Sequence, residues 1–419
     1  MILFDPASLI LTIFIVGYIL IIYEIYTKID KAATAICIAA TSWLILFVFG
    51  AYAKTYGQLI ECLSDTSQII FFLLGAMTLV EVIDAHRGFE VVQRFLRVRS
   101  KSLLLILSSS TTFFLSAVLD NLTTMILMIS ILRKLIPEKK ERIVPLCLAV
   151  IAANAGGAWT PIGDVTTTML WINEKISTSM VIATLFFPSL VALAVPLCIY
   201  LLFEKGSYPK LVHETKPREP RSLMILIVGL ISLTSVPIWK SLTGLPPFMG
   251  VLLGLATVWI LTDLFHTPYK DRDHLRIAYA LTKIDASGIL FFLGILLSVG
   301  ALNAAGILDK LADFLTLNVG GYTAVATAIG LASAIVDNVP IVAAAMGMYT
   351  LPIDHPFWLL TALTAGTGGS IFLIGSAAGV ALMGIEKIDF LEYLKRASLP
   401  AFLGYVGGIV CYLLGTYIS

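Results

Sequence analysis

The chain has 419 residues, of which 58% are hydrophobic and 13% are charged, and its formal net charge is +1. A soluble protein would carry roughly 25% charged residues, so this composition leaves no room for a separate soluble domain. The mean hydropathy is +0.94, and many uncharged stretches approach the ~20 residues that one helix needs to cross a bilayer. We therefore predict an all-α polytopic membrane protein, with the lipid bilayer and no nucleic acid as its partner.

Ten apolar segments are predicted to be crossings, and two further apolar pairs turn back at an Asp-Asn. The crossings are expected at 7–27, 33–53, 68–85, 143–170, 176–203, 222–240, 247–264, 286–305, 357–385 and 397–417. In the second pair, the arm from Asn338 to Thr350 would form only about 20 Å of helix, against a hydrocarbon core of ~30 Å. The pairs 102–136 and 320–350 are therefore predicted to be re-entrant hairpins.

The basic residues are distributed unevenly between the two sides of this topology. Alternating sides along the chain places 24 of the 28 Lys and Arg on one side, and leaves only Lys54, Lys175, Lys240 and Lys310 on the other. Cytoplasmic loops carry the excess of Lys and Arg in membrane proteins. The basic side, with the linker 204–221, is thus predicted to be cytoplasmic and both termini to be outside.

Short motifs occur twice in the same order. LSAVLDNLTT (115–124) is similar to ASAIVDNVPI (332–341), and GGAWTPIGDVTT (156–167) is similar to GGSIFLIGSAAG (368–379). Inverted repeats of this kind are typical of secondary transporters whose binding site lies near the membrane midplane between the copies. We predict two halves of five crossings each, inserted with opposite orientations, at residues 1–203 and 222–419.

Two of the crossings contain residues that disfavour an uninterrupted helix. The segment 143–170 would be about 40 Å long if it were fully helical, and it includes GGAWTPIGD with Pro161 and Gly163. Proline lacks an N–H, and glycine adopts backbone conformations that other residues avoid. The matching segment 357–385 is also long and rich in glycine. Both are predicted to be helices broken near mid-membrane, whose freed backbone groups line a polar cavity.

Only three acidic residues lie far from the end of a predicted membrane segment, namely Asp120, Asp164 and Asp337. A carboxylate in the membrane interior is costly and is a functional hypothesis by default. The structural alternative is a protonated aspartate that hydrogen-bonds the broken backbone. Asp120 and Asp337 are expected at the hairpin tips, where Asp is also an ordinary turn and capping residue.

Residues next to these aspartates supply further oxygen atoms for a small, hard cation. They are Asn121, Thr123, Thr124, Asn154, Thr166, Thr167, Thr168 and Asn338. Burial disfavours the charged form of a carboxylate and a nearby cation favours it, so binding of a proton and binding of sodium exclude each other. We expect Asp120 and Asp337 to form the coupled pair, with Asp164 as a third Na⁺ ligand or a second proton carrier.

Four segments carry a recognisable pattern: DNLTTMILMISILRKLIP, VIAANAGGAWTPIGDVTTTMLWI, SAIVDNVPIVAAAMGMY and GTGGSIFLIGSAAGVALMGIEKIDF. From about Ile70 onward the sequence resembles the NhaD-type sodium/proton antiporters of the ion transporter superfamily. The resemblance implies a homodimer in a bacterial-type inner membrane that exchanges cytoplasmic Na⁺ or Li⁺ for external H⁺, for pH homeostasis and sodium tolerance. It also implies roles in ion binding or proton coupling for Asp120, Asn121, Thr123, Asn154, Asp164, Thr166, Thr167, Ser333, Asp337, Asn338, Ser370 and Ser376.

Three other functions are considered beside exchange. A sodium-coupled carboxylate carrier of the same superfamily would have Ser-Asn-Thr at its hairpin tips, whereas the two Asp-Asn tips here would repel a carboxylate. An intramembrane aspartyl protease needs a G-x-G-D motif, but Pro161 stands before Ile162-Gly163-Asp164. A cation channel has no need of inverted repeats with broken helices, and transport that is insensitive to a proton gradient would favour it.

His86 follows the third predicted crossing, and we expect it at the cytoplasmic interface. Alternatively it senses cytoplasmic pH, because small shifts carry a histidine through the physiological range. The other four histidines are expected in loops. The protein is predicted not to be an enzyme and to need no cofactor beyond the ions it transports.

Overall fold

A computed structural model of the chain describes residues 5–208 and 219–418, and within these ranges the chain is almost entirely helical. The β pairing that it contains is one isolated antiparallel bridge, between Ser100 and Ser207. Residues 209–218, which form the middle of the predicted linker 204–221, lie outside the described residues.

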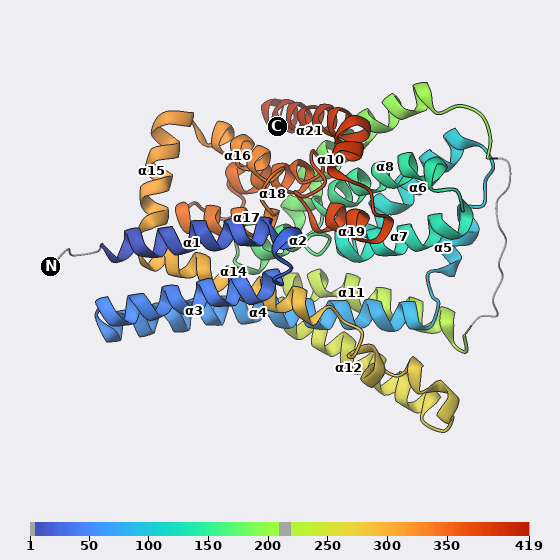
Figure 1. Cartoon of the computed structure of the whole chain (residues 1–419). Helices are drawn as coiled ribbons and strands as arrows, with labels where there is room; N and C mark the ends of the chain where they lie inside the picture. Colours follow the sequence, from blue (N-terminus) through green and yellow to red (C-terminus); the bar gives the residue numbers. More distant parts are fainter. Residues whose placement is uncertain (1–4, 209–218, 419) are drawn as a thin grey trace.

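The helices follow the predicted order along the chain (Figure 1). Those of the first half are α1 (Pro6–Ile22), α2 (Glu24–Thr27), α3 (Lys31–Phe49), α4 (Tyr52–Ala85), α5 (Glu90–Phe95), α6 (Lys101–Ser116), α7 (Asn121–Leu135), α8 (Lys139–Gly157), α9 (Val165–Ile172) and α10 (Thr178–Phe203). Those of the second half are α11 (Ser222–Thr243), α12 (Pro247–His266), η1 (Lys270–Leu275), α13 (Ile277–Ala280), α14 (Ala286–Ala304), α15 (Ile307–Val319), α16 (Tyr322–Ala332), α17 (Asn338–Met348), α18 (Pro356–Gly368), α19 (Ala377–Glu386), α20 (Phe390–Tyr393), η2 (Leu394–Ser398) and α21 (Leu399–Ile418).

Seven helices of the described chain are long and apolar enough to cross a membrane, and the bent pair α15–α16 would make an eighth. They are α3, α4, α10, α11, α12, α14 and the helix over Phe390–Tyr417, and each overlaps a predicted crossing. The other three predicted crossings are α1, which has 17 residues, and the interrupted pairs α8–α9 and α18–α19. The chain is therefore an all-α polytopic membrane protein.

The helix that contains the third predicted crossing begins earlier than the crossing itself. Residues 68–85 are only the second half of α4, which has 34 residues and begins at Tyr52, so the crossing predicted at 33–53 ends at Phe49. A helix of this length spans about 51 Å and extends well beyond a hydrocarbon core of ~30 Å. Hydropathy indicates the part of a helix that lies in lipid, while Gln, Glu and other polar helix formers continue the same helix outside it.

A second difference is α15, which falls between the predicted crossing 286–305 and the predicted hairpin 320–350. It is bent by 110° from α16 and runs across the direction of most other helices (Figure 1). Gly306, with φ +69°, and Gly320, with φ +110°, stand at its two ends. These backbone angles are left-handed and favour glycine, so they explain why the chain turns sharply on both sides of α15.

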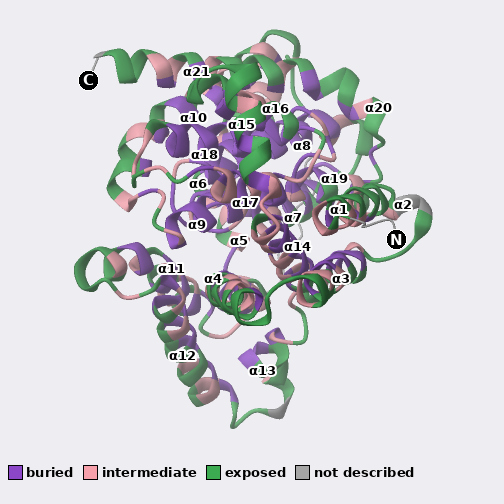
Figure 2. Ribbon diagram, turned by 90° about the vertical axis from the view of Figure 1, so that its left-hand side faces the viewer, coloured by how far each residue is buried: buried purple, intermediate pink, exposed green. Residues whose placement is uncertain are grey.

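The helices pack as two layers when the molecule is seen along most of its helix axes (Figure 2). We call one the support layer; it consists of α1, α3, α4, α11, α12 and α14. We call the other the hairpin layer; it contains α6 to α10, α16 to α19 and α21. Contacts of α4 with α9 and of α14 with α17 join the two layers. The interrupted helices lie at the centre of the hairpin layer, where every residue of α9 is buried.

Both predicted hairpins and both predicted helix breaks are present. The hairpin α6–α7 turns at 117–120 and the hairpin α16–α17 turns at 333–337, while the breaks lie at 158–164 and 369–376. In Figure 1 the two hairpins lie toward opposite ends of the molecule and their tips point to its middle. The turns and the breaks therefore meet at the same depth.

Each hairpin packs on its own interrupted helix through the same contact. Ser116 Oγ donates to the carbonyl oxygen of Ala153 at 2.6 Å, and Ser333 Oγ donates to that of Ala365 at 2.8 Å. In both copies a glycine of the interrupted helix lets the backbones approach, because a Cβ there would overlap a carbonyl oxygen of the hairpin arm. These pairs are Gly156 with Phe113 and Gly368 with Gly330.

Candidate functional site

The side chain of Asp164 is the point at which both hairpins meet. Asp164 precedes α9 at the end of the first helix break and is only 1% exposed. Its Oδ2 accepts hydrogen bonds from Thr166 Oγ1 at 2.9 Å and from Asn338 Nδ2 at 3.2 Å. Its Oδ1 lies 3.3 Å from Asn121 Nδ2. One buried carboxylate thus contacts an amide from each hairpin.

Asn154, in the last turn of α8, extends this network to the second interrupted helix. Its Oδ1 accepts from Asn121 Nδ2 at 3.0 Å, and its Nδ2 donates to Ser370 Oγ at 2.9 Å and to Ser376 Oγ at 2.8 Å. All four side chains are buried. We call the whole set the carboxylate cluster: Asn121, Asn154, Asp164, Thr166, Asn338, Ser370 and Ser376.

In the Asp-Asn pair at each hairpin tip, the aspartate caps the following helix and the asparagine contacts Asp164. Asp120 is the N-cap of α7; its Oδ1 accepts from the backbone N–H of Thr123 at 2.8 Å and its Oδ2 from Thr123 Oγ1 at 2.6 Å. Asp337 is the N-cap of α17 and accepts from the N–H of Val339 at 3.2 Å. Capping of this kind satisfies backbone donors at the start of a helix. The asparagine that follows each aspartate is then free to contact Asp164.

The predicted aspartates are therefore not equivalent in the structure. Asp120 and Asp337 are half-buried, and the hydrogen bonds given for them serve their own helices. Asp164 is the carboxylate that the hydrogen bonds place at the centre of the cluster. Coupling between Asp120 and Asp337 stays a prediction.

Three further predicted site residues lie close to the cluster without a hydrogen bond to it. Thr123 is engaged by Asp120, and Ser333 donates to a backbone carbonyl. Thr167 is fully buried and its hydroxyl has no hydrogen-bond partner in the described part of the chain. The buried hydroxyl of Thr124 also has no hydrogen-bond partner in the described part of the chain. The sequence predicted Thr124 as a source of oxygen, but the resemblance implied no role for it.

Comparison with known proteins agrees with this architecture. A family model described as a citrate transporter matches residues 2–366. Sodium/proton antiporter 1 of Arabidopsis thaliana is 49% identical, over 96% of this chain and 71% of that protein. Sodium/proton antiporter 2 of the same plant is 47% identical, over 96% of this chain and 98% of that protein. The Na⁺/H⁺ antiporter NhaD of Alkalimonas amylolytica is 30% identical, over 96% and 89%.

The chain belongs to the family whose model is described as a citrate transporter and, within it, to the NhaD-type antiporters. Family membership identifies a transporter and not an enzyme. In a transporter the path from the surface to the buried group matters as much as the group itself.

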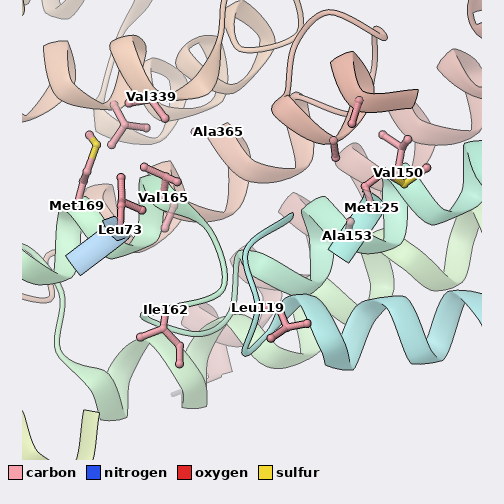
Figure 3. Packing of buried hydrophobic residues seen from close by; sticks show 14 of the residues in the cluster. Leu73, Leu119, Met125, Val150, Ala153, Ile162, Val165, Met169, Val339 and Ala365 are labelled. Carbon is pink, nitrogen blue, oxygen red and sulfur yellow. The ribbon is translucent and has the colours of Figure 1, made fainter. Parts of the chain in front are cut away.

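Apolar side chains surround the carboxylate cluster on the side of the support layer. Leu73 of α4 lies beside Val165 and Met169 of α9, with Val339 of α17 close by (Figure 3). A polar group in such surroundings has no water to replace a lost partner, so its hydrogen bonds and charge interactions are stronger than in solvent. The buried cluster therefore borders apolar side chains at the contact between the two layers.

A cavity of about 620 Å³ opens between the layers at the end of the molecule where α4 begins. It is lined by residues of α4, α14 and α17 and by the segment that follows α9, and its acids are Glu61, Asp65 and Glu174. Ile69 and Ala343 also line it; Leu73 and Val339 stand one helical turn further along the same helices. About one turn of apolar side chains therefore separates the cavity from the carboxylate cluster.

The side chain of His86, which was predicted to lie at the cytoplasmic interface, is fully buried within the protein. Its Nε2 lies 3.0 Å from Nε2 of His266, which is the last residue of α12 and not a loop residue. His86 Nδ1 lies 2.8 Å from the carbonyl oxygen of Val82 and so carries a proton. When His86 is neutral, its Nε2 accepts and His266 Nε2 is the donor between the rings. Its buried Nδ1, without a partner among the described residues, fits this neutral form.

Proposed function

We propose that this protein exchanges sodium ions for protons across a membrane, with Asp164 as the group for which they compete. The observation that carries the proposal is the burial of this one carboxylate between amides of both hairpin tips. The names of the relatives from Arabidopsis thaliana and Alkalimonas amylolytica support the same exchange.

The side chains of the carboxylate cluster can contact Asp164 both without a bound cation and together with one. Asn121 and Asn338 now donate N–H groups to Asp164, which stabilises its charge or shares its proton. Each carboxamide also has an oxygen on the opposite side, so half a turn of the amide presents an oxygen to a bound cation. Together with the hydroxyl of Thr166 this gives the set of oxygen ligands that a small, hard cation prefers.

Competition becomes exchange when the site faces each side in turn only while it is occupied. Burial favours the neutral carboxyl group, and a bound cation favours the carboxylate, so a proton and Na⁺ displace each other. In our proposal the hairpin layer moves against the support layer and carries the cluster past the apolar residues around Leu73. Asp120 and Asp337, close to the amides that contact Asp164, add negative charge that attracts the cation, and either can take up a second proton.

We propose further that residues 1–203 and 222–419 form an inverted repeat. The proposal is supported by the twofold occurrence of the serine contact between hairpin and interrupted helix. It is also supported by hairpins that lie toward opposite ends of the molecule (Figure 1). Such repeats allow one fold to present its central site alternately to either side.

Orientation, compartment and assembly follow from the sequence rather than from contacts. The excess of Lys and Arg on one side supports a cytoplasmic position for the loops between α4 and α6 and between α7 and α8, and an outside position for both termini. We propose a homodimer in a cytoplasmic membrane of bacterial type that also accepts Li⁺. The relatives include proteins of bacteria and of a plant.

A sodium-coupled carboxylate carrier is the second candidate, and the description of the matching family as citrate transporter favours it. Two Asp-Asn tips beside a buried carboxylate oppose it, because a carboxylate substrate would meet like charges at a short distance.

Purified protein in liposomes with an internal pH dye separates these functions. We expect external Na⁺ to change the internal pH, citrate to have no effect, and Asp164→Asn to abolish the Na⁺ response. Asp263→Asn is the matched control, since Asp263 pairs with Arg276 at 2.9 Å outside the cluster. Full exchange by Asp164→Asn would remove Asp164 from the mechanism. Citrate uptake without proton exchange by the unmodified protein would establish the carrier instead.

We also propose that the His86–His266 pair makes activity depend on pH. A proton added to His86 Nε2 would face the N–H of His266 and push the ends of α4 and α12 apart. Charged and titratable groups face the pair: Glu219, which lies 3.6 Å from Arg87, and Arg272 and His274 of η1.

A further inference from the structure

Gly366 faces Asp164 from the second interrupted helix. A Cβ built on Gly366 would lie 3.5 Å from Asp164 Oδ2, 3.6 Å from the carbonyl oxygen of Asn154 and 3.2 Å from Ala158 Cβ. The residue is buried and belongs to the last turn of α18. Glycine within a helix is less stable than alanine by about 0.5–1 kcal/mol, so its presence here calls for a physical reason.

Close packing of backbones, which explains neighbouring glycines, does not explain Gly366. A Cβ on Gly368 would overlap the carbonyl oxygen of Gly330, so a side chain is excluded there. At Gly366 two of the three distances are ordinary van der Waals contacts, and the third is tight only against the methyl group of Ala158. The missing side chain leaves a space that an atom could occupy, directly beside a carboxylate oxygen.

Two of the three atoms nearest to this position are oxygens, and the third is the methyl carbon of Ala158. Asp164 Oδ2 lies on one side and the carbonyl oxygen of Asn154 on another. Asn154 belongs to the last turn of α8, and the C-terminal end of a helix carries partial negative charge. A small cation in the space would therefore meet a carboxylate, a carbonyl oxygen and the negative end of a helix dipole.

The repeated motifs differ at this position. Counted back from the paired glycines, Asn154 in AANAGG corresponds to Gly366 in LTAGTGG. The first copy places a hydrogen-bonding amide there, and Asn154 uses it to hold Ser370 and Ser376. The second copy has no side chain at the equivalent position, where Gly366 faces Asp164.

We infer that Gly366 sets the size of the cation that Asp164 accepts. The inference rests on the proposed exchange function. A methyl group in the space shortens the distance available to a cation beside Oδ2, which disfavours Na⁺ more than the smaller Li⁺. Ala158 bounds the same space, so removing its methyl group has the opposite effect.

The test compares the Na⁺ and Li⁺ concentrations that give half-maximal proton exchange in liposomes. For Gly366→Ala we expect the Na⁺ value to rise about tenfold, which corresponds to about 1.4 kcal/mol, and the Li⁺ value to change far less. Ala158→Gly should lower the preference for Li⁺ over Na⁺, and the double variant should return toward the unmodified ratio. Gly384→Ala in α19, where a Cβ would meet no atom within 4 Å, is the control and should leave both values unchanged.

Equal changes for the two ions, or an unchanged ratio in both variants, would overturn the inference while exchange by the unmodified protein continues. Should Gly366→Ala fail to accumulate, Ala158→Gly carries the test alone, because it removes atoms and adds none. Absence of Na⁺-driven exchange in the unmodified protein would overturn the proposed function, and the inference with it.

Discussion

The two interrupted helices share one construction and differ in their chemistry. Both are preceded by a hairpin that donates a serine hydroxyl to them, and both need glycine where the backbones touch. At the start of the second half-helix, however, the first copy has Asp164 and the second has Ser376. Two residues before the first of the paired glycines, the first copy has Asn154 and the second has Gly366. Packing is duplicated, whereas the carboxylate and the space beside it come from different copies.

This difference shows that the packing of the hairpins and the chemistry of the carboxylate cluster depend on different residues. The packing of each hairpin on its interrupted helix depends on close contacts between backbones. These contacts need small residues such as Gly156 and Gly368, and both copies provide them. A second carboxylate at the position of Ser376 would lie close to Asp164 and repel it. In the proposed mechanism, in which ions compete for Asp164, the difference between the two copies therefore leaves one carboxylate at the centre of the cluster.

Substitutions at Asp164 and Ser376, the residues that precede the second half of each interrupted helix, should give the largest difference in activity. Asp164→Asn is expected to abolish Na⁺-driven proton exchange, because an amide can neither release a proton nor neutralise a cation. Ser376→Ala removes one of two hydroxyls bound by Asn154, a net loss of about 0.5–1.5 kcal/mol. It should raise the half-maximal Na⁺ concentration several-fold and leave exchange in place. Equal losses in dye-loaded liposomes would show that the two positions are equivalent after all.

The shared frame predicts equal damage from equivalent glycines. In Gly156→Ala and in Gly368→Ala the added methyl group overlaps a carbonyl oxygen of the neighbouring hairpin. Overpacking of this kind costs about 1–3 kcal/mol. Both variants should show a lowered thermal midpoint in detergent, by similar amounts, while Gly415→Ala, whose added Cβ would meet no atom within 4 Å, should not lower the midpoint. A large difference between the two variants would contradict the duplicated contact.

The two hairpin tips provide a finer comparison. Asn121 contacts both Asp164 and Asn154, whereas Asn338 contacts Asp164. Asn121→Ala therefore breaks two interactions and Asn338→Ala one, at roughly 1 kcal/mol each. We expect the half-maximal Na⁺ concentration to rise in both variants and to rise more in the first. The reverse order would mean that the tip of the second hairpin is the main ligand.

The smallest expected effect concerns pH at the far end of the support layer. Burial lowers the pKa of His86, against the opposing effect of the Val82 carbonyl. The neutral histidine pair is then stable above the ordinary histidine pKa of about 6.5, and its contribution is lost as the pH falls through the lowered value. His86→Gln cannot titrate, so its exchange activity should decline at a more acidic pH than that of the unmodified protein. An identical acid midpoint in the two pH profiles would exclude the pair as a sensor.

Much of the fold could be predicted because its signals are local. Apolar runs between charged loops revealed the crossings, and short arms around Asp120 and Asp337 revealed the hairpins. The break around Pro161 was visible in its own residues. The start of α4 was missed, because hydropathy does not register a helix that continues into water. The short helix α15 was also missed, because it is not one long apolar run.

Less of the site could be predicted. The sequence identified Asp164, Asn121 and Asn338 as oxygen-bearing residues, but it ranked the tip aspartates first because both stand in the repeated motif. A turn aspartate caps the helix that follows it, and the neighbouring asparagine is the residue left to turn inward; only the folded tip shows which does which. The pairing of His86 with His266 could not be foreseen either, since 180 residues separate them.

The sequence by itself determined that the chain is a membrane protein, where its helical hairpins and helix breaks lie, and which three carboxylates stand far from the ends of the apolar segments. All of these depend on the cost of placing polar groups in hydrocarbon. Tertiary structure alone decided that Asp164 is the shared centre, that Gly366 leaves a space beside it, and that an apolar layer closes it from the nearby cavity. Those facts depend on which side chains of distant segments point at each other, and no local preference for helix, turn or lipid contains that information.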